Sequence, residues 1–410
     1  MQPNPYGLLE AIGIELEYMV VDRSTLNVEP IVDRLMHDLS GEYATELEMG
    51  PIAWSNELAL HVLELKTNGP VPTLEGLDEL FLQNVREANR QLVEHDTMLL
   101  PTAMHPWMDP HREMRLWPHE HNAVYEAFDS IFNCRGHGWA NLQSMHINLS
   151  FGTIEEFGRL HAAIRLLLPI LPALAASSPL KDGSATGTMD TRLQVYRHNA
   201  DRIPSIAGRV IPEPVFTRRD YEAKILHPIY RDLETHDPTG ILRHEWVNAR
   251  GAIARFDRGA IEIRVLDVQE HPAADLAIAQ LAIAAIRRLT EEVDVELAAQ
   301  EAFSVDRLVP IFDACVRAGE RGLVRDADYL SCFGLDDDDV HADELWLHIA
   351  EATKVFEGPF AEPLSVILEH GCLAKRIVRS LPRTAKKRDL QRLYRQLAHC
   401  LDRGHSFVGF

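Results

Sequence analysis

The strongest constraint on the fold is a pattern that occurs in three widely separated segments of the chain. Residues 12–21, 144–151 and 259–268 each alternate between apolar and polar side chains. Successive side chains of a β-strand point to opposite faces, so this alternation predicts strands with one buried and one polar face. The polar positions carry Glu15 and Glu17 in the first segment, His146 and Asn148 in the second, and Glu262 and Arg264 in the third.

If these strands are neighbours in one sheet, their carboxylates and imidazole converge on a single surface. Such donors can hold hard divalent cations such as Mg²⁺ or Mn²⁺, and clustered carboxylates need a cation to stay ionised together. Glu57 and Glu64 add two carboxylates, but their odd separation places them on opposite faces of an ideal strand. Both reach the same site only if a turn or bulge lies between them. The residues alone leave a second interpretation open, in which the polar face is simply in water.

The rest of the chain predicts helices and loops around this sheet. Residues 74–99 and 273–290 have helical periodicity, and residues 157–174 predict a helix broken near its prolines. Residues 176–219 are rich in Gly, Ser, Pro and Thr and predict long loops. We therefore expect an α+β fold, with a curved antiparallel sheet and helices on its outer face. A catalytic domain is expected over residues 1–290, with a helical C-terminal region over residues 291–410 packed on it.

Charge and composition exclude several classes of function. The net charge of −21 in 410 residues repels phosphate backbones, so nucleic acid is not expected as a partner. Five cysteines without a C-x-x-C pair predict free thiols rather than a disulfide framework. No secretory signal is visible, and the apolar runs are interrupted or too short to span a bilayer. We expect a cytoplasmic protein without membrane contact.

Other motifs of catalysis are absent or weak in the sequence. There is no G-x-x-x-x-G-K-[ST] loop, no G-x-G-x-x-G after a strand and no G-x-S-x-G elbow. His119-Glu120-His121 offers two imidazoles, but a third zinc ligand is not evident nearby. The polar faces of the three strands therefore remain the main candidate site.

Six short elements, in order over most of the first 290 residues, carry a family resemblance. They are G-I-E-L-E at 13–17, the pair Glu57 and Glu64, His105-Pro106-Trp107, S-M-H-I-N at 144–148, A-S-S-P at 176–179 with Thr186-Gly187 and Arg192, and A-I-E-I-R-V-L-D at 260–267. Together they resemble the glutamate–cysteine ligase family, in particular its bacterial carboxylate–amine ligase branch. The resemblance implies a glutamine synthetase-like fold.

The resemblance also implies roles for individual residues. Glu15, Glu57 and Glu64 would bind one metal, and Glu17, His146 and Glu262 a second. Arg264 would contact phosphate, with Arg192 as a second catalytic residue. Arg197, Arg250 and Arg255 are further candidates for contacts with nucleotide phosphate or substrate carboxylate. The implied reaction uses ATP and Mg²⁺ or Mn²⁺ to join glutamate, or a similar carboxylate, to an amine.

Two departures from the branch concern the substrate more than the chemistry. Asn148 stands where the branch has a second histidine, and the local sequence around 188–192 differs. Two other functions stay open from the residues: a metal-dependent amide hydrolase, which would need no ATP, and a non-catalytic nucleotide-binding homologue. A homodimer is expected by resemblance only, and the identity of the amine is not determined.

Overall fold

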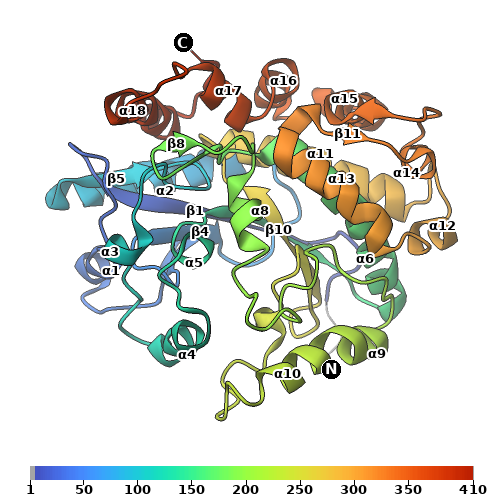
Figure 1. Ribbon diagram of the computed structural model, residues 1–410, viewed down its shortest axis with the longest axis horizontal. Helices are drawn as coiled ribbons and strands as arrows, with labels where there is room; N and C mark the ends of the chain where they lie inside the picture. Colours follow the sequence, from blue (N-terminus) through green and yellow to red (C-terminus); the bar gives the residue numbers. More distant parts are fainter. Residues whose placement is uncertain (1–4, 410) are drawn as a thin grey trace.

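The three alternating segments form neighbouring strands of one eight-stranded sheet, in a computed structural model that describes residues 5–409 (Figure 1). The strands are β1 (Ile12–Asp22), β2 (Glu46–Met49), β3 (Ile52–Asn56), β4 (Val62–Thr67), β5 (Thr97–Leu100), β6 (Ser144–Ser150), β9 (Ala252–Arg255) and β10 (Ala260–Asp267). Their order is β2-β3-β4-β1-β6-β10-β9, and β5 pairs with the C-terminal half of β1. Every pairing is antiparallel. The predicted antiparallel sheet of an α+β fold is confirmed.

Helices pack on the apolar face of the sheet. The side chains of Ile14, Leu16 and Tyr18 on β1 are fully buried there. The helices in the first part of the chain are α1 (Val32–Ser40), α2 (Leu77–Leu92), α3 (Pro110–Glu113), α4 (Asn122–Phe132), α5 (His137–Ala140), α6 (Ile154–Leu167), α7 (Leu171–Ala175), α8 (Thr191–Tyr196), α9 (Arg218–Tyr221), α10 (His227–Leu233) and α11 (Pro272–Thr290). Among them, α6 and α7 contact β10, and α11 packs on both α6 and α2.

The last part of the chain is mostly helical and lies along one side of the molecule, coloured orange to red in Figure 1. Its α-helices are α12 (Leu297–Glu301), α13 (Val305–Ala318), α14 (Ala327–Ser331), α15 (Ala342–Thr353), α16 (Ala361–His370), α17 (Leu373–Arg379) and α18 (Lys387–Arg403). One apolar cluster joins Leu16 of β1, Leu276 of α11 and Trp346 of α15. The division at residue 290 into a catalytic domain and a helical region stays a prediction.

One predicted helix is shorter than its sequence pattern. Helix α2 ends at Leu92 and is followed by the short 3₁₀ helix η1 (Val93–His95). Asp96 then adopts a left-handed φ of 55°, which ends the helical turn, and Thr97 begins β5. The apolar residues of 97–100 therefore belong to a strand that pairs with β1, which periodicity within one segment could not reveal.

The predicted loops over 176–219 contain some regular structure. A hairpin of β7 (Leu180–Lys181) and β8 (Ser184–Ala185) precedes α8. Asp190 caps α8 by accepting a hydrogen bond from the backbone N–H of Leu193. This segment places α8 close to the polar face of the sheet.

One helical run, Ile154–Ala175, has the length and apolar character needed to cross a membrane. However, 94% of its most apolar window is buried inside the protein. It consists of α6, the 3₁₀ helix η2 (Leu168–Ile170) and α7, which pack beneath the sheet. Such burial is typical of a core helix.

Candidate active site

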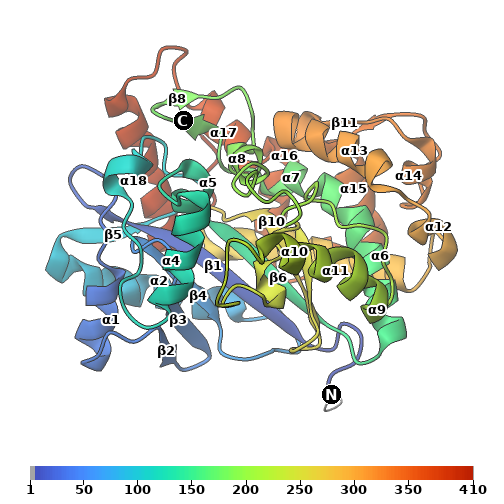
Figure 2. The same cartoon turned by 60° about the horizontal axis from the view of Figure 1, so that its bottom comes forward.

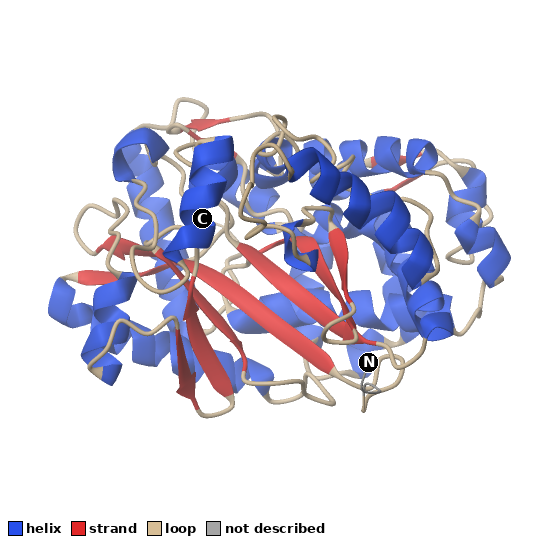
Figure 3. Cartoon of the chain, turned by 90° about the horizontal axis from the view of Figure 1, so that it is seen from below, coloured by secondary structure: helices blue, strands red, loops and turns tan. Residues whose placement is uncertain are grey.

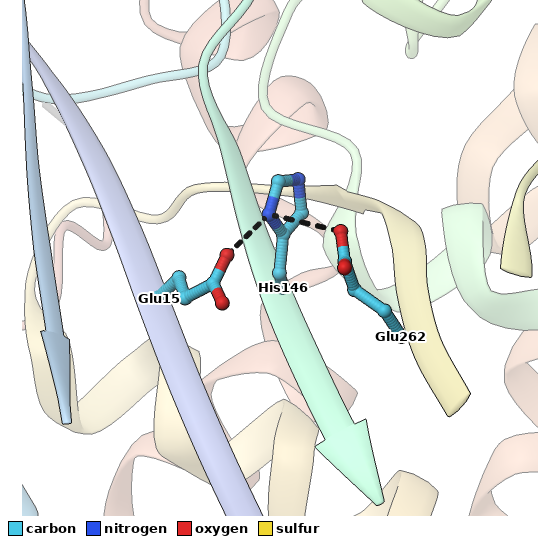
Figure 4. A group of neighbouring side chains, drawn as sticks. All are labelled: Glu15, His146 and Glu262. Atoms are coloured by element: carbon cyan, nitrogen blue, oxygen red, sulfur yellow. Dashed lines mark hydrogen bonds and ion pairs between the residues drawn. The ribbon is translucent and has the colours of Figure 1, made fainter. Parts of the chain in front are cut away.

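The polar faces of β1, β6 and β10 meet as the alternation predicts. Glu15 lies opposite His146 in the β1–β6 register, and Glu262 lies opposite Asn148 between β6 and β10. Figure 4 shows Glu15, His146 and Glu262 pointing toward one another from these three strands. The Nδ1 atom of His146 lies 2.9 Å from Glu15 Oε2 and 3.9 Å from Glu262 Oε1. Their ligand atoms are close enough to hold one metal ion.

A second group lies beside the first on the same face. Glu17 is opposite Glu64 in the β1–β4 register, and their carboxylates share a possible metal position with His146. The chain turns between Glu57, directly after β3, and Glu64 in β4, so the turn that both residues need to reach one site is present. Glu57 lines the same cavity as Glu17.

The expected ligands lie in two groups that share one histidine. Glu15 lies with His146 and Glu262, and Glu17 lies with Glu64 and the same His146. In the register, Glu15 faces His146 on β6 and Lys66 on β4, and Glu17 faces Glu64 on β4. The grouping expected from the resemblance, with Glu15, Glu57 and Glu64 on one metal and Glu17, His146 and Glu262 on a second, stays a prediction.

The acidic groups have strongly perturbed pKa values. Burial alone would raise the pKa of Glu15, but the hydrogen bond and charge of His146, with Lys66 and Arg264, lower it to about 2. Burial and the charge of Glu15 raise the pKa of Glu64 to about 7. Burial, with Glu17 and Glu64 nearby, raises the pKa of Glu57 well above its usual value. The raised pKa values of Glu57 and Glu64 favour their protonated forms, and a nearby cation would lower both pKa values.

His146 is held from both sides of its ring. Its Nε2 lies 2.9 Å from the hydroxyl of Ser144, and its Nδ1 bonds Glu15. Burial alone would lower the pKa of His146, but Glu15, Glu17 and Glu262 raise it to about 9. Ser144 also donates its backbone N–H and its hydroxyl to Glu17 Oε2, at 2.6 and 3.0 Å. These contacts fix the orientation of both groups.

A β-bulge positions Arg264. The pairing of β10 with β6 shifts between Ile263 and Leu266, so Arg264 and Val265 together face His146. The Arg264 side chain donates through Nε to Glu262 Oε1 at 2.5 Å. Gly251 accepts the backbone N–H of Arg264, and a Cβ at Gly251 would lie 2.5 Å from the Val265 side chain. The bulge therefore needs a glycine there.

Arg192 supports this bulge. Its Nη2 donates to the backbone carbonyl of Arg264 at 2.7 Å, and its Nη1 lies 3.4 Å from Asp267 Oδ1. Asp267 is itself held by the N–H of Ser177 and the hydroxyl of Ser178. Arg192 thus lies at the site as expected, and most of its donors are used to hold Arg264 in place.

The other candidate arginines lie farther from the carboxylates or are already paired. Arg197 pairs with Asp313 on α13 at 2.9 Å. Arg250 forms a double hydrogen bond with Glu213 and lies outside both cavities described below. Arg255 is 3.5 Å from Glu262 and also contacts Asp257. It therefore reaches the site through its ion pair with the Glu262 carboxylate.

Glu15, Glu17, Glu57, Glu64 and Glu262, with His146 among them, form what we call the carboxylate row. A cavity of about 500 Å³ opens over one end of this row. Figure 2 shows α4 and α5 in front of the strands and α8 above them, and these elements supply much of its wall. The floor carries Glu17, Glu57 and His146, with Arg192 and Arg264 at one side. We call this space the aromatic cavity, because its wall is made by Tyr125, Phe128, Trp139, Tyr196 and Trp246.

A second cavity of about 520 Å³ lies over the other end of the row. The sheet on which both cavities lie is drawn in red between the helices in Figure 3. We call it the polar cavity, because Lys66, Asn68, Asn148, Arg258 and Glu15 line it. Lys66 bonds Glu46 at 2.6 Å and lies 3.3 Å from Glu64.

Sequence reasoning did not assign Lys66, Arg258 or the aromatic wall to the site. Lys66 alternates with Glu64 on the same strand face, which is a signal that could have found it. Arg258, Trp139 and Trp246 lie in a turn or in very short helices, whose side-chain directions follow no period in the sequence. Tyr125 and Phe128 are three residues apart on α4, a helical spacing that could have placed them on one face.

Comparison with known proteins identifies the family. A model of glutamate-cysteine ligase family 2 matches residues 11–396. The chain belongs to this family. The resemblance to the glutamate–cysteine ligase family is therefore confirmed. Because the members of this family are ligases, the chain is classed as a ligase.

Relatives agree with this membership. A protein of Archaeoglobus fulgidus with no assigned activity is 31% identical over 97% of this chain and 100% of its own length. A Ruegeria pomeroyi protein provisionally named glutamate–cysteine ligase 2 is 24% identical over 68% of this chain and 65% of its own. The crystal structure of glutamate–cysteine ligase from Francisella tularensis in complex with AMP has a TM-score of 0.61. It is 12% identical and covers 97% of this chain and 90% of that one, so it supports the fold.

Proposed function

We propose that this member of glutamate-cysteine ligase family 2 is an ATP-dependent carboxylate–amine ligase that acts through an acyl phosphate. The observation that carries the proposal is the row of five carboxylates and one histidine between two cavities of different chemistry. Such a row can receive a phosphate chain from one side and a carboxylate from the other. A glutamine synthetase-like relationship, a homodimer and a cytoplasmic location remain predictions.

The donor set fits divalent cations. Carboxylate oxygens and an imidazole suit Mg²⁺ or Mn²⁺, and a bound cation would lower the raised pKa values of Glu57 and Glu64. We assign Glu15, His146 and Glu262 to one ion, and Glu17 and Glu64, with Glu57 beside them, to the other. Bound cations would supply positive charge to the phosphate oxygens.

The polar cavity suits the nucleotide. Lys66 and Arg258 offer positive charge to phosphates, and Asn68 and Asn148 offer amide hydrogen-bond groups. Asn148 donates to Glu15 Oε1 at 3.0 Å, so its side chain joins the polar cavity to the carboxylate row. The departure from a second histidine at this position therefore leaves a group that orients Glu15.

The aromatic cavity suits the carboxylate and the amine. Arg264 lies where it can stabilise a phosphoryl group in transfer, and Arg192 holds its backbone. The carboxylate oxygen attacks the γ-phosphorus of ATP, and the bond from that phosphorus to the bridging oxygen breaks to release ADP. This chain contributes by aligning the two substrates across the row.

The amine then forms the new bond. Its nitrogen attacks the acyl carbon, and the bond from that carbon to the phosphate oxygen breaks, so phosphate leaves with the electron pair. Of the three protons of the starting ammonium, one stays on the amide, one leaves with phosphate and one passes to a base. Glu57, at the floor of the aromatic cavity, is the carboxylate we assign as that base.

The test is ADP release from Mg-ATP with glutamate, in the presence of hydroxylamine as a small trap for an acyl phosphate. We expect ADP, phosphate and a hydroxamate in equal amounts. Product formation without ATP would instead support the amide hydrolase. Nucleotide binding without ADP release, across a wide panel of carboxylates, would support a non-catalytic homologue.

A further inference from the structure

The wall of the aromatic cavity is a fixed set of rings. The Trp139 ring centroid lies 5.2 Å from that of Phe128, and the Trp246 centroid lies 6.0 Å from the same ring. Trp139 donates its Nε1–H to the backbone carbonyl of Asn199, and Trp246 stacks on His244. Since Trp139, Tyr196 and Trp246 are only half-buried, they offer apolar surface that a ligand can cover.

The cavity has few positive groups to bind a carboxylate. Among the residues 5–409, its lining contains the guanidinium groups of Arg192 and Arg264 and no lysine. Arg192 gives its Nη atoms to Asp267 and the Arg264 carbonyl, while Arg264 bonds Glu262 and Tyr196. The ring of His146 is bonded through both nitrogens. The remaining donors of Arg264 are enough for one anionic substrate.

The same cavity has a carboxylate at its floor. The Glu57 carboxylate accepts a hydrogen bond from the backbone N–H of Leu58, at 3.3 Å. Asn199 also lines the cavity, but its Oδ1 atom is buried and its Nδ2 donates to the Gly138 carbonyl. A carboxylate beside aromatic faces is an arrangement that favours an ammonium group.

From these observations we propose that the second substrate is a primary amine with an aromatic or bulky apolar body and no carboxylate of its own. Its ammonium group lies at Glu57 on the cavity floor, and its body lies against Trp139 and Trp246. This inference rests on the proposed ligase function and adds the class of acceptor to it. An α-amino acid is disfavoured because its carboxylate would lie near Glu17 and Glu57, while Arg192 is paired within the protein and the remaining donors of Arg264 are taken by the first substrate.

The test compares amines with the amino acids that differ from them only by the carboxylate. The pairs are phenethylamine with phenylalanine, tryptamine with tryptophan, and cysteamine with cysteine, each with Mg-ATP and glutamate. We expect kcat/KM to be at least about tenfold higher for each amine than for its amino acid, and higher for phenethylamine than for cysteamine. Products are identified by mass, and ADP is measured in parallel.

A variant tests the position of the acceptor body. Trp246→Ala should lower kcat/KM for phenethylamine about tenfold more than it lowers the rate of hydroxamate formation. Phe356→Ala, an aromatic residue 38% exposed on the helical side and outside the cavity, is the matched control and should leave that ratio unchanged.

The outcomes distinguish a failure of the proposed acceptor class from a failure of the proposed ligase function. If no ADP forms even with hydroxylamine, the ligase proposal fails and the acceptor class fails with it. If hydroxamate forms but amino acids equal or exceed their amines, or if no amine reacts, the ligase stands and the acceptor class is wrong. An unchanged ratio in Trp246→Ala would place the acceptor elsewhere and would also overturn the inference.

Discussion

The two cavities share one row of carboxylates but differ in the residues around it. The aromatic cavity has rings from α4, α5, α8 and the 3₁₀ helix η4 (Glu245–Val247) above Glu17 and Glu57. The polar cavity has Lys66, Arg258 and amide side chains beside Glu15. Since both are of similar volume, composition rather than size distinguishes them.

This difference shows how one sheet face can serve two substrates. Glu15 lines the polar cavity and Glu17 lines the aromatic cavity, although they are only two residues apart on β1. Lysine and arginine then suit phosphates on one side, while aromatic rings and the Glu57 carboxylate suit an amine on the other. The predictions below test whether the two sides are functionally separate.

The largest effect on ADP release is expected for a substitution in the carboxylate row, where the aromatic and polar cavities meet. Glu262→Gln removes the charge that lies 3.9 Å from His146 and that pairs with Arg264. ADP release should fall by about a thousandfold or more, with an unchanged circular dichroism spectrum. Glu362→Gln, exposed on α16, is the control and should be as active as the wild type. Normal ADP release in a folded Glu262→Gln would refute the site assignment.

The next effect is on stability and depends on pH. Because the folded pKa of Glu64 is raised to about 7, its contribution to the free energy of unfolding is present below pH 4.5 and is lost as pH rises to 7. Metal-free Glu64→Gln should therefore be about 3 kcal/mol more stable than wild type at pH 8 and equal to it near pH 4. Urea unfolding with a chelator measures both values. A stability difference that does not change with pH would contradict the assignment.

A smaller effect should be confined to the polar side. Lys66→Met removes the ammonium group that lines the polar cavity beside Glu64. KM for ATP should rise about thirtyfold, a change of about 2 kcal/mol, while KM for the amine stays within about twofold. Lys224→Met, at an exposed lysine, is the control. An equal rise in both KM values would show that the two cavities are not separate.

The smallest effect on catalysis is expected for Asp267, which supports Arg192 of the aromatic cavity. Asp267→Asn weakens the pairing that holds Arg192 against the bulge carbonyl. We expect kcat to fall about tenfold with little change in KM for ATP. Asp313→Asn frees Arg197, which lines neither cavity, and should leave the steady-state rates unchanged. A larger loss in Asp313→Asn than in Asp267→Asn would reverse the roles given to the two arginines.

Much of the sheet face could be predicted because period-two alternation is a local property. The segments around Glu15, His146 and Glu262 each show it, and each became a strand with its polar face toward the site. The odd separation of Glu57 and Glu64 showed that a shared site needs a turn between them, but the turn itself was seen only in the structure. The helix expected to 99 was wrong at its end, because β5 is stabilised by pairing with a distant strand.

By itself, the sequence determined which side chains share a face and which family the chain resembles. Only the tertiary structure decided which carboxylates lie together, because register between β1, β4 and β6 depends on contacts far apart in the chain. The bulge at Arg264 and the aromatic wall likewise arise from packing between segments. Alternation sets the direction of a side chain locally, whereas its neighbours across the sheet are set by long-range pairing.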